Sequence, residues 1–201
     1  MKKLFPIALM ILGLLFVGGG VYAADRGLDA RDQVRSELLA QNITTPEDAS
    51  IPNVVVKDAA TAQSMADVIA KHAEESTGGL TYSELGRFMA ADGDPAGTSD
   101  EAKALKGADG KPVANGLRNT AFQASALRTS LYTSVMAFNV ADLVVGLGLM
   151  ILALGVVVGG VGVVLASLAI PALARRFHVE PVVAPATTAI AVAPPATQAA
   201  A

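Results

Sequence analysis

The sequence predicts an all-α membrane protein, in which two transmembrane helices extend into a small extracytoplasmic helical domain. The first observation behind this fold class is an excess of apolar residues, which make up 52% of the 201 residues. The excess is concentrated in two segments, residues 4–24 and 143–174, each long enough to cross a bilayer. The second observation is the polar composition of residues 25–142, which are sufficient for one small domain.

Four parts follow from this pattern. We expect an N-terminal transmembrane helix or signal peptide at 1–24 and an extracytoplasmic α-helical domain at 25–142. A second transmembrane helix follows at 143–174. Residues 175–201 are rich in proline and alanine and nearly uncharged, which predicts a disordered cytoplasmic tail.

The second apolar segment is the clearer of the two. Residues 143–170 carry no charge over 28 positions, whereas about 20 helical residues span a bilayer core. The surplus implies a tilted helix or a helix end that projects beyond the core. Pro171 and the pair Arg175-Arg176 are expected to close this helix.

Small residues recur along the second segment at helical spacing. Gly155 and Gly159 form a GxxxG pair, and Gly162 with Ala166 repeats the spacing. Such residues let a second helix approach closely, although glycine is also common in membrane helices generally. We expect helix packing here, against the first apolar segment. That segment has its own glycines: Gly13, Gly18, Gly19 and Gly20.

The opening stretch has two interpretations. Two lysines, an apolar run and the small-residue pattern Val21-x-Ala23 are typical of a cleaved signal peptide. However, the apolar run Leu4–Ala24 has 21 residues, longer than the roughly 7–15 of a signal core. We favour a retained helix.

Basic residues beside the two segments predict the orientation. Lys2 and Lys3 precede the first segment, and Arg175 and Arg176 follow the second. The positive-inside rule therefore places both termini in the bacterial cytoplasm and residues 25–142 outside the plasma membrane. Three arginines just after the first segment favour the opposite orientation: Arg26, Arg31 and Arg35.

The outer region reads as a series of helices and connectors. Expected helices cover 27–42, 58–76, 81–91 and 99–106, and a last helix runs from near Leu117 into the second segment. The helix at 81–91 is inferred from the capping box Thr81-Tyr-Ser-Glu84, and residues 46–57 and 107–116 are expected to be irregular. One face of the 58–76 helix is apolar: Ala62, Met65, Ile69 and Ala73. The candidate core residues are Val54, Ile69, Leu80, Leu85, Phe88 and Leu105.

The stretch DGDPAGTSDEAK resembles a calcium-binding loop at a few positions. Asp92, Asp94 and Asp100 fall where ligands would be needed, but Ala96 and Lys103 occupy two other ligand positions. A lysine in place of the bidentate glutamate opposes a cation. An acidic connecting loop or a weak calcium site are the alternatives, and we expect no metal site and no cofactor.

Several chemistries are excluded or unsupported. The chain has no cysteine, so disulfides, thiolate metal sites and cysteine nucleophiles are ruled out. His72 has no second histidine nearby, and no serine-hydrolase or nucleotide-binding motif is present. Residues 25–142 carry 17 Asp/Glu against 11 Lys/Arg, a balance of −6 that argues against a nucleic-acid surface.

Three parts of the chain resemble those of a known family of proteins. They are the stretches LLAQNITTPEDA and GGLTYSELGRF and the last helix, which runs into the second segment. The chain is similar to small two-span actinobacterial membrane proteins of unknown function, to which the name aromatic ring-opening dioxygenase is often attached. The resemblance implies two spans with a helical outer region between them. The name implies iron held by two histidines and a carboxylate. His72 lies in the outer region and His178 in the tail, so this chain departs from that pattern.

Three functions remain as hypotheses. The favoured one is a structural, accessory or protein-interaction role in the cell envelope, without catalysis, whose partners are the lipid bilayer and other membrane proteins. The second is an extracytoplasmic sensor that binds a small ligand or cation. The third is an envelope enzyme, supported only by scattered carboxylates and serines.

Overall fold

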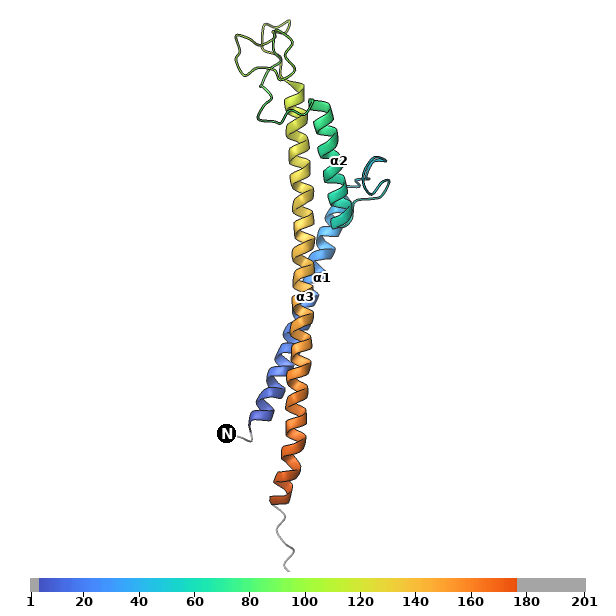
Figure 1. Ribbon diagram of the computed structural model, residues 1–201, viewed down its shortest axis with the longest axis vertical. Coiled ribbons are helices and arrows are strands. Elements are labelled where there is room, and N and C mark those ends of the chain that lie inside the picture. Colours follow the sequence, from blue (N-terminus) through green and yellow to red (C-terminus); the bar gives the residue numbers. More distant parts are fainter. Residues whose placement is uncertain (1–3, 177–201) are drawn as a thin grey trace, which may run out of the picture.

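The protein consists of three helices, and its shape is set by the longest of them (Figure 1). The computed structural model describes residues 4–176, with side chains described for residues 4–168. Helix α1 spans Phe5–Ala40, α2 spans Ala59–Thr77 and α3 spans Gly116–Arg176. No β-strand occurs within residues 4–176, which contain isolated β-bridges only. The predicted all-helical fold is therefore confirmed for this range, as is the presence of two helices long and apolar enough to cross a membrane.

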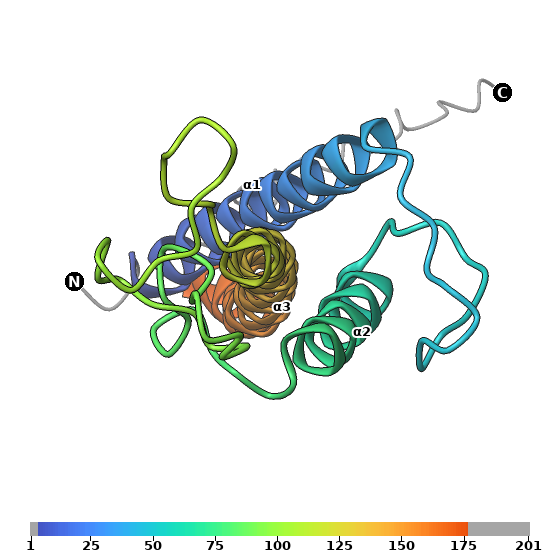
Figure 2. The ribbon, with the colours of Figure 1, turned by 90° about the horizontal axis from the view of Figure 1, so that it is seen from above.

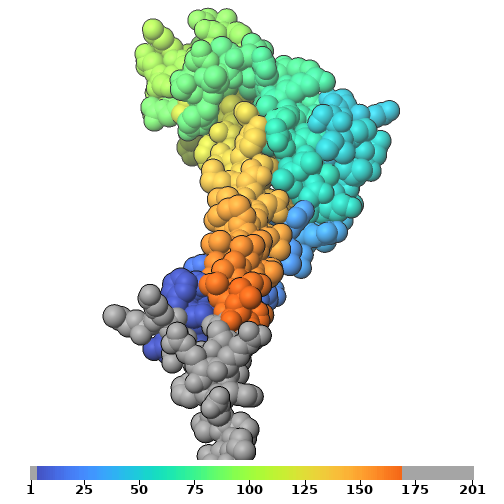
Figure 3. Space-filling model, turned by 60° about the horizontal axis from the view of Figure 1, so that its bottom comes forward, coloured from blue at the N-terminus to red at the C-terminus, as the bar shows by residue number. Residues whose placement is uncertain are grey.

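Helix α3 runs through the whole molecule. With 61 residues it is roughly 90 Å long, at about 1.5 Å per residue. Helix α1 runs antiparallel to its C-terminal half, and α2 lies beside its N-terminal half (Figures 1 and 2). In the space-filling view the α1–α3 pair forms a narrow stem, and α2 with the two long loops forms a wider head (Figure 3).

The largest hydrophobic core lies where all three helices meet. Its central residues come from the end of α1, the residues just before α2, the first turns of α2, and the middle of α3. They are Leu38, Val56, Ala62, Ala66, Leu131 and Phe138. Met65 and Ile69 pack against this core, which confirms the apolar face expected for the second helix. The core therefore joins the head to the stem.

Helix α2 has a well-defined beginning and end. The Asp58 carboxylate accepts a hydrogen bond from the Thr61 backbone N–H at 2.9 Å, and the Thr61 hydroxyl group accepts one from the Asp58 N–H at 3.1 Å. This capping box satisfies backbone donors that the first turn of a helix leaves free. Gly78 ends the helix with a φ of 65°, a left-handed conformation that glycine adopts easily. Both ends agree with the predicted range 58–76 to within one residue.

The loop between α1 and α2 is fixed to both of its neighbours. The backbone N–H of Thr45 donates to the Val54 carbonyl at 2.9 Å, so the loop folds back on itself. Thr45 is buried, and its hydroxyl group accepts from the Val54 N–H. The hydroxyl of Ser64 on α2 accepts from the Ile51 N–H at 2.9 Å. The sequence-based expectation of an irregular connector here is confirmed.

Residues 80–115 correct the sequence-based expectation. The helices predicted at 81–91 and 99–106 do not form, and the chain between α2 and α3 is a long irregular loop. Glu84 does accept a hydrogen bond from the Thr81 N–H at 2.8 Å, but only a turn follows. The backbone instead pairs across the loop: Phe88 and Thr98 exchange two hydrogen bonds of 2.9 and 2.8 Å. Long-range pairing competes with the local hydrogen bonds that a helix requires.

This loop is held on the end of α3 by one arginine. The Arg118 guanidinium donates to the backbone carbonyls of Tyr82, at 2.9 Å, and of Leu85. It also lies 3.8 Å from the centroid of the Tyr82 ring, a cation–π contact. Leu85 is fully buried. Arg118 therefore anchors the start of the loop to the first turn of α3.

The predicted core was only partly right. Leu85 is buried and Ile69 packs against the core, but Leu105 is 40% exposed and Val54 is half-buried. Val56 is buried in place of Val54. The difference arises because the core forms between helices, whereas the prediction assumed packed short helices within residues 80–106.

The end of the second apolar segment differs from expectation at Pro171. Helix α3 continues through Pro171 to Arg176, the last residue that the structure describes. Proline removes one backbone N–H donor, and a long helix can pass it with the neighbouring turns intact. The predicted disordered tail lies almost wholly at 177–201, outside the described residues.

Candidate functional site

The contact between α1 and α3 repeats every seven residues. On α1 the buried positions of the stem are Pro6, Gly13, Gly20 and Gly27. On α3 the buried positions opposite them are Ala141, Gly148, Gly155 and Gly162. We call these eight residues the small-residue seam. A seven-residue repeat keeps one face of each helix toward the other as they wind around each other, the geometry of a left-handed coiled coil.

The seam brings the two backbones into direct contact. A Cβ atom added to Gly13 would lie 2.5 Å from the Gly159 Cα, and one added to Gly155 would lie 2.6 Å from the Val17 nitrogen. A Cβ added to Gly20 would lie 2.5 Å from the Leu152 nitrogen. Separations this short leave no room for any side chain. The seam therefore needs glycine at these positions to keep the helices this close.

The glycines predicted for helix packing are placed unequally. Gly155 and Gly162 lie in the seam, and Ala166 is half-buried. Gly159 is half-buried and packs against Gly13, since a Cβ added to Gly13 would lie 2.5 Å from the Gly159 Cα. Both glycines of the GxxxG pair, Gly155 and Gly159, therefore contact Gly13, while the buried positions of the seam repeat every seven residues. On α1, Gly13 and Gly20 lie in the seam. A Cβ atom added to Gly18 or Gly19 would have no atom of another element within 4 Å.

The seam aligns the two apolar segments with each other. Gly13 lies against Gly159, and Gly148 lies against Ala24, so residues 4–24 of α1 run beside about 148–168 of α3. At about 1.5 Å per residue, these 21 paired residues cover roughly 32 Å, close to a bilayer core of about 30 Å. Residues 143–147 extend past this paired length, toward the head.

An ion pair lies just beyond the aligned segments. Arg31 on α1 donates to Asp142 on α3 at 2.9 Å, and both side chains are about half exposed. Asp142 directly precedes the second apolar segment, so the pair marks the transition from the apolar to the polar part of the stem. Exposed pairs of this kind contribute at most about 1 kcal/mol.

The outer surface of the aligned segments is apolar. Leu14 is 73% exposed and Val157 is 62% exposed, and they are typical of large apolar side chains along both helices. Of the most apolar 18-residue stretch of each helix, only 11% is buried inside the protein. An apolar surface on helices of this length is compatible with a lipid environment.

The acidic loop does not assemble its carboxylates. Asp92, Asp94 and Asp100 each accept a hydrogen bond from the backbone N–H two residues later, at 3.2, 2.9 and 2.9 Å. Each carboxylate therefore stabilises its own turn. Within the described part of the chain, no group of three or more His, Asp or Glu side chains could hold a metal ion.

His72 takes part in a surface cluster with the first loop. The Asp48 carboxylate lies 2.9 Å from His72 Nε2 and 3.0 Å from Lys71 Nζ. Hydrogen bonds from Lys71 and then His72 lower the pKa of Asp48. The cluster ties the α1–α2 loop to α2.

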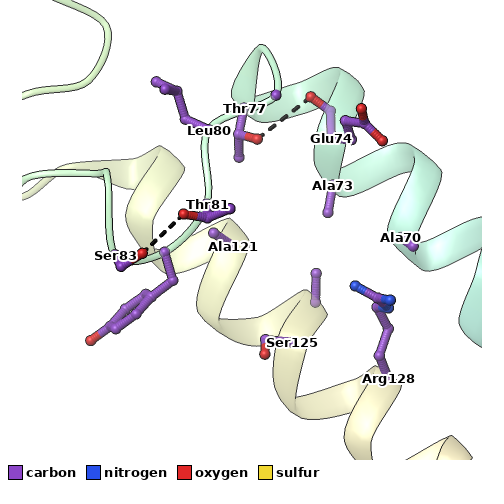
Figure 4. Close-up of a pocket in the computed structure, with 13 residues that line it drawn as sticks. Ala70, Ala73, Glu74, Thr77, Leu80, Thr81, Ser83, Ala121, Ser125 and Arg128 are labelled. Carbon is purple, nitrogen blue, oxygen red and sulfur yellow. Dashed lines mark hydrogen bonds between the residues drawn. The ribbon is translucent and has the colours of Figure 1, made fainter.

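A cavity of about 660 Å³ lies between the end of α2 and the first turns of α3. Alanines form much of its wall: Ala70, Ala73, Ala121 and Ala124. Figure 4 shows the Arg128 side chain reaching from α3 toward the turn of α2 that holds Ala70 and Ala73. Thr81 and Ser83 line the opposite end of the cavity.

Sequence reasoning did not single out Arg128. The nearby Tyr132 hydroxyl donates to Asp67 at 2.7 Å, and this hydrogen bond raises the pKa of Tyr132, while Arg128 acts in the opposite direction. Arg128 is half-buried, and its Nε atom is buried without a hydrogen-bond partner among the described residues. No signal in the sequence distinguishes Arg128 from the other arginines, because its setting depends on the packing of α2.

Comparison with protein-family models, curated proteins and solved structures finds no match to this chain. The functional conclusions below therefore rest on the geometry of the described residues.

Proposed function

We propose that the protein is a two-span plasma-membrane protein of the cell envelope, in which the α1–α3 stem holds the head outside the membrane. The observation that carries this proposal is the small-residue seam together with the apolar surface around it. The seam aligns two segments of bilayer length, and their remaining surface is apolar. Lipid would cover that surface, since nothing within the described protein does.

The seam also favours a retained N-terminal helix. Val21 and Ala23, the residues of the possible cleavage site, lie in the middle of α1. Cleavage there would remove the helix that packs along residues 148–168. Intact-mass measurement of the protein from its native membrane tests this directly. A mass that includes residues 1–23 is expected, and a mass beginning at Ala24 would contradict a two-span protein.

The proposed orientation has both termini in the cytoplasm and the head outside. Its support is the basic flanks, Lys2-Lys3 and Arg175-Arg176. Because the chain has no cysteine, single cysteines report orientation without background. Glu101→Cys in the head should react with an impermeant maleimide in intact cells, and Gln198→Cys should react only after the cells are opened. The reverse pattern would overturn this orientation.

Within this architecture we propose a structural or protein-interaction role. The continuous helix α3 connects the aligned segment to the head without a break, so the head is carried at a set distance from the aligned segment. A similarity to small two-span actinobacterial membrane proteins agrees with this arrangement. Crosslinking in native membranes, followed by purification, should return the same partner in every replicate. Recovery of the protein alone, as a monomer, would count against the proposal.

A further inference from the structure

The cavity between α2 and α3 is lined by an arginine, Arg128, whose hydrogen bonding within the protein is incomplete. No ion pair to Arg128 forms among the residues with described side chains, and Nε of Arg128 has no hydrogen-bond partner there. A buried donor without a partner destabilises the folded protein, and more so when it is charged. An arrangement of this kind is typical of a site that a ligand completes.

The chemistry of the guanidinium group indicates what the ligand carries. A guanidinium presents its N–H donors in one plane, matched to the two oxygens of a carboxylate. Arg118, by contrast, uses its Nη1 group to hold the carbonyls of Tyr82 and Leu85. Arg128 is the cation that lines the cavity, so it is positioned to receive an anion there.

The remaining lining sets two further requirements. The alanine wall and Leu80 offer apolar surface, which favours a ligand with an apolar body. Glu74 also lines the cavity, and α2 ends beside it at Gly78. A carboxylate and the C-terminal end of a helix both disfavour additional negative charge. The lining thus accepts one negative charge and opposes a second.

We propose that this cavity binds a small organic monoanion, whose carboxylate pairs with Arg128 and whose apolar body lies against the alanine wall. The volume of about 660 Å³ lies within the range of small-molecule sites. The site goes beyond the proposed membrane role. It does not depend on the orientation of the protein in the membrane, so the two proposals can fail separately.

Calorimetric titration of the full chain in lipid nanodiscs tests the proposal, with 3-phenylpropionate as the probe. We expect saturable binding, and binding at least about tenfold weaker for the neutral 3-phenylpropionamide and for the dianion phenylsuccinate. Arg128→Met, which keeps the length of the side chain, should weaken 3-phenylpropionate binding about tenfold or more. Lys106→Met removes a cation outside the cavity and should leave binding unchanged.

Three results would overturn the proposal: no saturable binding of 3-phenylpropionate, equal binding of its amide, or wild-type affinity in Arg128→Met. Glu74→Gln provides a second measurement should Arg128→Met fold poorly. Because Glu74 is exposed, its replacement is compatible with the fold. Glu74→Gln should narrow the difference in affinity between phenylsuccinate and 3-phenylpropionate. An unchanged difference in affinity would contradict the proposal that the lining opposes a second negative charge.

Discussion

At the scale of single residues, the glycines of α3 differ in what faces them. In the seam, glycine is required because the opposite backbone occupies the place of a side chain, as at Gly155. Gly160 lies five residues further along the same helix, and a Cβ atom added to it would have no atom of another element within 4 Å. The two positions have the same residue type in the same helix and differ only in what faces them. They form a matched pair for mutation.

Gly155→Val should separate the stem helices, whereas Gly160→Val should not. A valine in the seam would overlap the α1 backbone, and overpacking of this kind destabilises by about 1–3 kcal/mol or more. The cysteine-free chain allows a direct readout: Arg31→Cys with Asp142→Cys, joined by a short bismaleimide. We expect a lower yield of this crosslink with Gly155→Val and an unchanged yield with Gly160→Val. Equal yields in both variants would show that the seam does not hold the helices together.

A second residue-scale prediction concerns pH. The hydrogen bonds from Lys71 and His72 lower the pKa of Asp48, so the folded protein favours the ionised carboxylate. The stabilisation is fully present above the ordinary pKa of about 4 and is lost as the pH falls through the lowered value. Asp48→Asn should therefore lower the Tm near neutral pH, and the difference in Tm from wild type should shrink as the pH falls below the ordinary carboxylate pKa of about 4. A difference independent of pH would exclude the ionised carboxylate as its cause.

At the scale of elements, α2 forms because its ends and one face are all satisfied. Its capping box, its terminal glycine and its apolar face agree with one another. The glycine and the apolar face were evident in the sequence, whereas the Asp58–Thr61 capping box is seen in the structure. The motif Thr81–Glu84 offers a similar capping signal, and Leu85 and Phe88 follow it at helical spacing, but no helix forms there. The backbone there pairs across the loop. A cap alone does not make a helix.

Asp58→Ala should weaken α2 more than a comparable change elsewhere on the helix. Removal of an N-cap residue costs about 0.5–2 kcal/mol. Glu75→Ala, at an exposed position near the end of α2, is a suitable control because Glu75 makes no cap. Thermal unfolding followed by circular dichroism should give a lower Tm for Asp58→Ala than for Glu75→Ala. The same Tm in both variants would show that the cap contributes little to α2.

At the scale of the whole molecule, the register between α1 and α3 determines which residues fit into a bilayer. Residues 143–170 are all apolar, and composition does not distinguish among them. The seam pairs 148–168 with the apolar part of α1 and leaves 143–147 beside the charged residues that follow Ala24. The surplus length is thus accommodated by projection of the helix toward the head.

This register makes a prediction about accessibility. Leu143 and Val157 are equally exposed in the protein, at 61% and 62%, so any difference between them reports the surroundings. In native membranes, Leu143→Cys should react with a water-soluble maleimide and Val157→Cys should not. Both should react once the membrane is dissolved. Equal reactivity in the intact membrane would contradict a bilayer around residues 148–168.

The amino-acid sequence by itself determined the two long apolar helices and the position of α2. These features depend on composition and on local signals such as caps and periodicity. The GxxxG pair Gly155 and Gly159 was predicted for helix packing and does contact α1 at Gly13, whereas the seven-residue repeat Gly13, Gly20 and Gly27 was not predicted.

Only the tertiary structure decided the register of the stem, the irregular path of residues 80–115 and the setting of Arg128. Each of these depends on contacts between residues far apart in the chain. Gly155 is a seam residue because α1 passes beside it, and Arg128 lines a cavity because α2 packs across from it. The free energies of such contacts depend on which surfaces meet, and no local pattern of residues specifies that.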